Sequence, residues 1–115
     1  MVEIDRDMNE TLGEFEVLVL TGVLACGDDA YGMTVQEEVE ALVGAERNVS
    51  IGAIYTTLGR LEEKGLLRSW FGDPTNERGG RAKKFYRLTA PGKRVLDIAL
   101  EPMAKALRVV RQGAE

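Results

Sequence analysis

The spacing of the hydrophobic residues changes twice along the chain, from helical to alternating and back to helical. This order of segments limits the folds that the chain can adopt. Apolar residues recur at helical spacing in three consecutive segments between residues 12 and 66. Two alternating runs follow at residues 67–72 and 81–88, and helical spacing returns from residue 89. The 115 residues are therefore predicted to form one mostly α-helical domain with a small β-hairpin before its last helix.

The third predicted helix, at about residues 51–64, has an outer face of small and hydroxyl-bearing residues. Ser50 is a favourable N-cap, and Ile54, Leu58 and Leu61 lie on the apolar stripe. The residues expected at its start and on or beside its outer face are Ser50, Gly52, Ala53, Tyr55, Thr56, Thr57 and Arg60. Solvated helices usually carry alternating Glu and Lys, so this face is expected to contact another molecule closely.

The two alternating runs enclose residues 73–80, which are rich in turn-forming residue types. Together they predict a β-hairpin with a long loop. The basic residues and the glycine expected at or beside its tip are Arg78, Gly80, Arg81, Lys83 and Lys84. A glycine lets the backbone approach a partner closely, although it suits a flexible tip equally well.

Charge is distributed unevenly along the chain, whose formal net charge is −4. Residues 1–46 hold twelve acidic residues and one basic residue, whereas residues 47–94 hold eleven basic and four acidic residues. A basic segment inside an acidic chain indicates a face that binds a polyanion. The simpler interpretation is a solvated surface, but the clustering of these charges on the hairpin favours a polyanion.

Three helices followed by a basic hairpin are typical of a winged helix-turn-helix domain. In such domains the second helix of the motif enters the major groove of DNA. We therefore expect residues 1–88 to form a DNA-binding domain, with a recognition helix at about residues 51–64 and a wing at about residues 67–88. The wing would lie along the sugar–phosphate backbone or in the minor groove of double-stranded DNA.

Residues 89–115 are predicted to form one long helix that begins at the N-cap Thr89. Its apolar residues recur at alternating steps of four and three: Leu96, Leu100, Met103, Leu107 and Val110. This seam is typical of a helix that packs lengthwise on another helix.

Four short motifs resemble the PadR (phenolic acid decarboxylase repressor) family of bacterial winged-helix regulators. They are Ala-Tyr-Gly at residues 30–32, Val-Ser-Ile-Gly-Ala-Ile-Tyr at 49–55, Leu-Gly-Arg-Leu-Glu-Glu-Lys-Gly-Leu at 58–66, and the run from Gly80 through Lys-Phe-Tyr-Arg-Leu-Thr to Gly92. The resemblance covers roughly residues 11–100. The family usually has threonine-leucine-tyrosine-proline in the third helix, whereas residues 53–56 here read Ala-Ile-Tyr-Thr.

The resemblance implies a homodimeric transcription factor, most often a repressor, that binds a pseudo-palindromic operator and is released by a small effector. Family dimers form mainly through the C-terminal helix, with help from the first helix, so the apolar seam is expected to be the dimer contact. The short single C-terminal helix is similar to the smaller subgroup of the family. Some relatives stack planar ligands on a tryptophan of that helix, but the only tryptophan here, Trp70, lies in the wing.

The composition argues against catalytic and metal chemistry. The chain has no histidine, the commonest general base and metal ligand, and its one cysteine, Cys26, cannot form an internal disulfide or a cysteine-based zinc site. We therefore expect no catalytic residue, cofactor or metal. An enzyme would need carboxylate or lysine chemistry, yet Glu37, Glu38 and Glu40 lie along a helix surface.

Two further expectations concern the location and the partners of the chain. The longest uncharged stretch, residues 17–27, is too short to span a membrane, and the acidic first residues differ from a signal peptide. A cytoplasmic protein without a membrane partner is the prediction. The alternative to a DNA-binding regulator is a winged-helix module that binds another protein, for which the acidic first 46 residues would provide a surface.

Overall fold

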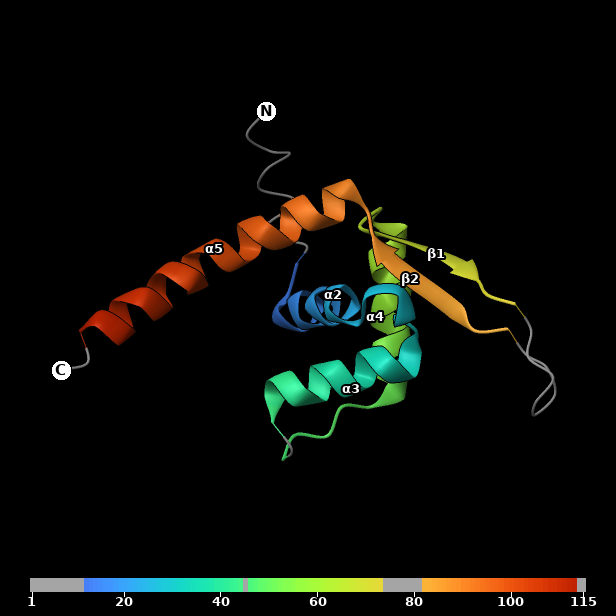
Figure 1. Ribbon diagram of the computed structural model, residues 1–115, viewed down its shortest axis with the longest axis horizontal. Coiled ribbons are helices and arrows are strands. Elements are labelled where there is room, and N and C mark those ends of the chain that lie inside the picture. Colours follow the sequence, from blue (N-terminus) through green and yellow to red (C-terminus); the bar gives the residue numbers. More distant parts are fainter. Residues whose placement is uncertain (1–11, 45, 74–81, 114–115) are drawn as a thin grey trace.

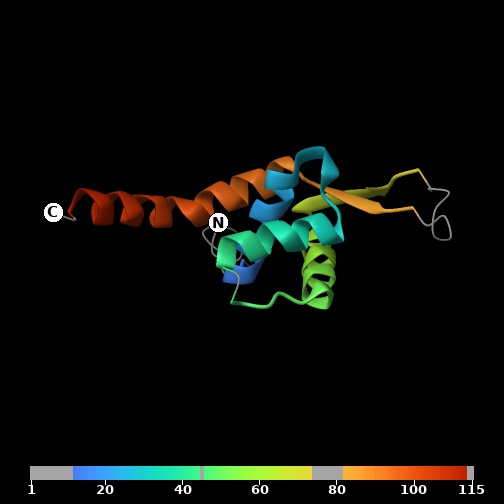
Figure 2. The same ribbon diagram turned by 60° about the horizontal axis from the view of Figure 1, so that its bottom comes forward.

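The computed structural model describes residues 12–44, 46–73 and 82–113. Its elements are α2 (Glu14–Cys26), the 3₁₀ turn η1 (Gly27–Asp29), α3 (Gly32–Val43), α4 (Ile51–Glu63), β1 (Leu67–Phe71), β2 (Lys84–Leu88) and α5 (Ala90–Gln112). Their order is the predicted one, so the mostly helical fold with one β-hairpin is confirmed. The hairpin and the far end of α5 extend from opposite sides of the helical body (Figures 1 and 2).

Helix α2 lies at the centre of the fold, between α3 and α5, as Figure 1 shows. Its Val19 and Leu20 are completely buried. They pack in one core with fully buried residues of α3 and α4, among them Val35, Ile54 and Leu58. Burial of side chains of this size contributes about 1.5–3 kcal/mol each, so this three-helix core is the main source of stability.

The hairpin is antiparallel, with Leu67 opposite Leu88 and Ser69 opposite Tyr86. Leu67, Tyr86 and Leu88 are buried and turn one face of the hairpin toward the core. The backbone N–H of Tyr86 also donates a hydrogen bond of 2.9 Å to the carbonyl of Ala30, just before α3. The base of the wing is therefore attached both to the core and to the helix-turn-helix.

Local chemistry sets both ends of α4. The Ser50 hydroxyl oxygen accepts a hydrogen bond of 2.9 Å from the N–H of Ala53 and caps the first turn. Gly65 follows the last turn with a φ of +80°, and the N–H of Leu66 donates to the carbonyl of Leu61 at 3.0 Å. This is the glycine stop that the sequence predicts, because a left-handed residue here favours glycine.

The first turns of α5 belong to the core of the domain. The Thr89 hydroxyl accepts from the N–H of Gly92 at 3.0 Å and donates to the carbonyl of Gly65 at 2.7 Å. Gly92 lies so close to the backbone of Leu66 that a Cβ there would collide with the Leu66 carbonyl oxygen. Beyond these turns α5 leaves the body (Figure 2). The division of the chain at residue 89 into two units stays a prediction.

Candidate nucleic-acid interface

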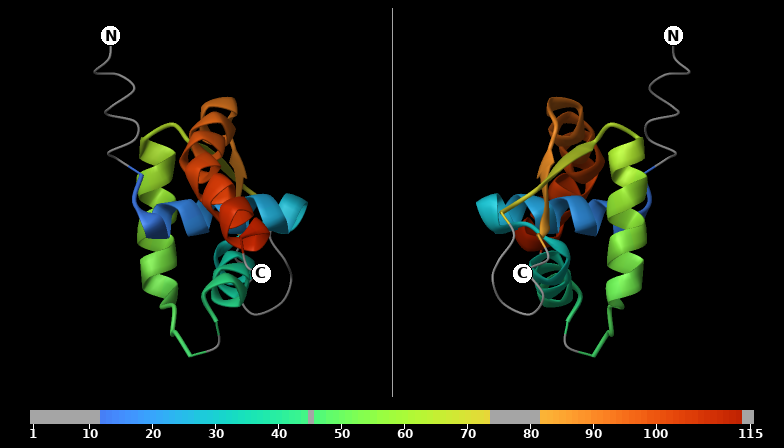
Figure 3. Two further views of the ribbon diagram at one scale, coloured as in Figure 1. Left: turned by 90° about the vertical axis from the view of Figure 1, so that its left-hand side faces the viewer. Right: turned by 90° about the vertical axis from the view of Figure 1, so that its right-hand side faces the viewer.

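Helix α4 stands along one flank of the molecule, as both views in Figure 3 show. The structure brings Ser50, Gly52, Ala53 and Thr56 together on its exposed side. A Cβ added at Gly52 would meet only the Ser50 hydroxyl oxygen, at 3.8 Å. The start of α4 is therefore an open surface that a large molecule can approach to the backbone.

Two features of this surface suit an anion. The N-terminus of an α-helix carries unpaired N–H groups and a partial positive charge, which favour phosphate. Ser50 uses its oxygen to accept from Ala53, so its hydroxyl hydrogen remains able to donate to a second group. The start of α4 thus combines small residues, a donor and a favourable dipole.

Tyr55 is half exposed, and its ring lies over Gly32, the first residue of α3. A Cβ at Gly32 would collide with the phenol ring and its hydroxyl group. The absence of a side chain at Gly32 therefore makes room for the Tyr55 ring between α3 and α4.

The prediction that Thr57 flanks the outer face is wrong. Its side chain is only 4% exposed. Thr57 lies three residues after Ile54 and four before Leu61, so it falls on the buried stripe of α4. Its angular position beside the outer face falls within the width of the buried stripe, and Thr57 is not a candidate for DNA contact.

Arg60 is half exposed at the C-terminal half of α4, and its guanidinium lies 3.8 Å from the carboxylate of Glu16 in α2. The ammonium of Lys64 lies nearer to the same carboxylate, at 2.9 Å. Sequence reasoning missed Glu16, because Lys64 is 48 residues away and no spacing pattern connects them.

The described part of the wing holds Lys83 and Lys84, whereas Arg78, Gly80 and Arg81 lie outside the described residues. The ammonium of Lys83 lies 4.3 Å above the centre of the Tyr31 ring. The ammonium of Lys84 lies 3.7 Å from the Glu62 carboxylate. Both contacts are solvent-exposed and therefore weak, so both cations can turn to phosphates.

An aromatic group at the base of the wing holds two further cations. Trp70 stacks on Phe85 with ring centres 6.1 Å apart. The guanidinium groups of Arg68 and Arg87 lie 5.2 and 5.7 Å from the Trp70 ring centre. Arg68 and Arg87 face one another across the hairpin, where like charges are unfavourable, and the contact of each guanidinium with the Trp70 ring offsets part of this cost. Arg68 was not among the predicted wing residues, because its place opposite Arg87 and beside the Trp70 ring becomes evident only when the two strands pair.

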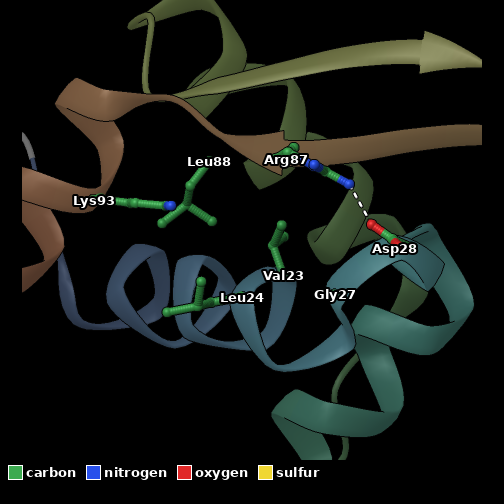
Figure 4. A pocket seen from close by; sticks show the side chains of 7 residues that line it. All are labelled: Val23, Leu24, Gly27, Asp28, Arg87, Leu88 and Lys93. Atoms are coloured by element: carbon green, nitrogen blue, oxygen red, sulfur yellow. Dashed lines mark hydrogen bonds and ion pairs between the residues drawn. The ribbon is translucent and has the colours of Figure 1, made fainter.

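A small pocket of about 220 Å³ lies between α2, β2 and the start of α5 (Figure 4). Val23, Leu24 and Leu88 form its apolar wall. Arg87 reaches across to an ion pair with Asp28, and the Lys93 side chain extends toward Leu88 in Figure 4. The pocket thus offers an apolar wall beside two cations.

The outer part of α5 exposes a row of large apolar side chains. Leu100, Met103, Leu107 and Val110, predicted on one seam, are all exposed. Leu96 is not part of this surface, because it is 5% exposed and packs in its own core. The prediction that Leu96 belongs to an intermolecular seam is wrong. The same periodic pattern places apolar residues in the core at the start of α5 and on an exposed face further along the helix.

Within residues 12–44, 46–73 and 82–113, no helix has the length and apolar character to cross a membrane. No group of three or more Cys, Asp or Glu side chains suited to a metal ion occurs in the same ranges.

Known proteins resemble the chain in sequence and in fold. The model of the transcriptional regulator PadR-like family matches residues 20–98, more than half of the chain. The crystal structure of a PadR family transcription regulator from hypervirulent Clostridium difficile R20291 has a TM-score of 0.63 and 27% sequence identity, covering 90% of this chain and 100% of that chain.

Two more distant structures share the fold. A PadR family transcriptional regulator from Eggerthella lenta DSM 2243 has a TM-score of 0.59 and 23% identity, covering 99% of this chain and 91% of that chain. A transcriptional regulator from Clostridium thermocellum has a TM-score of 0.64 and 17% identity, covering 100% of this chain and 98% of that chain.

Proposed function

Because the chain belongs to the PadR-like family of transcriptional regulators, we propose that it is a homodimeric repressor that binds double-stranded DNA of specific sequence. In this proposal α4 enters the major groove and the hairpin lies along the sugar–phosphate backbone. The observation that carries the proposal is the open start of α4, where Ser50, Gly52, Ala53 and Thr56 are exposed together.

Each group on this surface suits a different part of DNA. Gly52 and Ala53 allow the helix backbone to come close to the floor of the groove. Thr56 and Arg60 hold the hydrogen-bonding groups that can read base edges, and a guanidinium can bind guanine with two hydrogen bonds. Ser50 and the N-terminus of α4 suit a phosphate, and Lys83 and Lys84 supply sequence-independent attraction from the wing.

The dimer is proposed on the apolar surface of α5. A soluble helix rarely leaves side chains such as Met103 and Leu107 in water at 64% and 48% exposure without a partner. A groove of about 670 Å³ between the start of α2 and the middle of α5 continues this surface. Two-fold packing there would place two recognition helices about 34–36 Å apart, which fits a pseudo-palindromic operator.

Release by a small effector completes the proposal. The pocket beside Arg87 and Lys93 joins the wing strand, the central helix and the start of α5. A molecule bound among these three elements would contact both the DNA-binding part and the helix that is proposed to make the dimer. The position of the pocket supports a link between effector binding and release from DNA.

The test begins with a footprint of the purified protein on the DNA upstream of its own gene. Fluorescence anisotropy then compares the protected sequence with a shuffled duplex of equal length. Arg60→Ala is expected to cost about 1–3 kcal/mol on the protected sequence and much less on the shuffled duplex. Arg108→Ala on the outer part of α5 is the matched control, with no expected change.

Equal loss on both duplexes would make Arg60 a phosphate contact. No binding of the parent protein to either duplex at low salt would overturn the proposed function and favour a winged-helix module that binds another protein.

A further inference from the structure

A buried carboxylate, Glu16, connects the start of α2 with the recognition helix α4. Its Oε1 accepts a hydrogen bond of 2.9 Å from the backbone N–H of Gly13. Its Oε2 lies 2.9 Å from the Lys64 ammonium and 3.8 Å from the Arg60 guanidinium. Figure 3 shows the first turns of α2 beside α4. Two helices that are distant in sequence therefore meet at one side chain.

Burial explains why Glu16 needs these cations. Its side chain is only 9% exposed, and a buried carboxylate is destabilising unless charges and hydrogen bonds satisfy it. Lys64 is the nearer cation. Arg60 lies one helical turn earlier and keeps 51% of its side chain exposed, so it meets Glu16 with one edge while the rest faces solvent.

We propose that Glu16 is a positioning residue for Arg60 in DNA recognition. This inference rests on the function proposed above. A long side chain loses rotamer freedom when it binds, and an ion pair formed beforehand reduces that cost. Glu16 is suited to hold Arg60 because its carboxylate is itself fixed by Gly13. A guanidinium has five N–H donors, so the edge turned away from Glu16 stays available to a base.

The same carboxylate limits the charge that α4 presents to DNA of any sequence. Arg60, Lys64 and Glu16 together carry a net charge of +1. Without the carboxylate, the half-exposed Arg60 guanidinium would be offered to phosphates, and phosphate contacts gain affinity through counterion release whatever the sequence. Glu16 therefore favours the correct sequence in two ways, by orienting Arg60 and by reducing attraction to phosphates.

The test compares Glu16→Gln with Glu14→Gln by anisotropy on the operator and on a shuffled duplex. Both changes remove one negative charge from the first turn of α2, but Glu14 is exposed. For Glu16→Gln we expect the operator-to-shuffled affinity ratio to fall at least about threefold. A well-oriented arginine that binds a base with two hydrogen bonds contributes more than this factor to the discrimination between sequences. The salt slope on shuffled DNA should steepen by about 0.9 for each new phosphate contact per protomer. Glu14→Gln should leave the ratio unchanged.

A double-mutant cycle separates positioning from a structural role. If Glu16 acts through Arg60, the change in ratio caused by Glu16→Gln disappears in a protein that already carries Arg60→Gln. The inference is overturned if Glu16→Gln changes the operator-to-shuffled affinity ratio equally with and without Arg60→Gln, or if its ratio matches that of Glu14→Gln. Neither result would contradict the proposed DNA binding. A parent protein without any sequence preference would instead overturn the proposed function.

Circular dichroism and urea unfolding show whether each variant is folded. If Glu16→Gln does not fold, Glu16→Asp keeps the charge and moves it back by one methylene group. The ratio is then expected to fall in Glu16→Asp, again only when Arg60 is present. An unchanged ratio in that folded variant overturns the inference.

Discussion

The phenol ring of Tyr55 lies over Gly32, so that a Cβ at this first residue of α3 would collide with the ring and its hydroxyl group. Tyr55 belongs to the helix that is proposed to read DNA, and Gly32 begins the helix packed against it. The absence of a Cβ at Gly32 therefore makes room for the Tyr55 ring between the two helices.

Gly32→Ala is therefore expected to lower the free energy of unfolding by about 1–3 kcal/mol, the usual cost of overpacking. Urea unfolding monitored by circular dichroism measures it. Gly59→Ala is the control, because a Cβ at Gly59, inside α4, would meet nothing within 4 Å. It should stabilise the protein by about 0.5–1 kcal/mol. Equal stability of the two variants would contradict the tight Tyr55–Gly32 contact.

Leu107→Glu is expected to convert the proposed dimer to a monomer, since it places a charge in the apolar seam of α5. Sedimentation velocity over a range of concentrations measures the association. Lys105→Glu, on the opposite side of the same helix, should remain dimeric. Deleting the chain after Thr89 is a poorer test, because Val95 and Leu96 complete the core. A Leu107→Glu protein that associates as tightly as the parent would exclude this seam.

Replacing Arg81, Lys83 and Lys84 together by alanine should weaken binding to every DNA sequence by a similar factor. Each lost phosphate contact reduces the slope of log K against log salt by about 0.9, and a symmetric dimer doubles the change. Anisotropy titrations at several salt concentrations give the slope, with Lys105→Ala as the control. A folded triple variant with the slope of the parent would show that the wing does not contact DNA.

Cys26 is expected to react slowly with iodoacetamide near neutral pH. Burial raises the pKa of its thiol above the ordinary value, the Thr34 hydrogen bond lowers it, and nearby carboxylates such as Glu38 raise it further. A raised pKa leaves less of the reactive thiolate at a given pH. The midpoint of the rate–pH curve should therefore lie at higher pH for the folded protein than for the chain in urea. A lower midpoint would contradict this prediction.

The bounds of α4 could be predicted because their causes are local in the sequence. Ser50 caps the helix within three residues, and Gly65 ends it with a backbone conformation that favours glycine. The hairpin could be predicted for a similar reason, since alternating residues such as Tyr86 and Leu88 turn to the core. These features need no knowledge of which helices touch.

The remaining features depend on contacts between distant parts of the chain. In the sequence alone, Glu16 cannot be distinguished from an exposed acidic residue. Its burial and its ion pair with Lys64 become evident only when the fold places α2 beside α4. Leu96 and Leu107 follow one periodic pattern, yet one fills the core and the other faces solvent. Thr57 shows the converse, because a polar residue type occupies a position that geometry buries.

Because α5 runs without a break from the core to the proposed dimer seam, its length would set the distance between the two recognition helices of the proposed dimer. Inserting one residue between Leu96 and Leu100 would turn the seam by about 100° and lengthen the helix by about 1.5 Å. Four inserted residues would nearly restore the face while adding about 6 Å. In the proposed dimer, a longer α5 would therefore change the half-site separation without any change in α4.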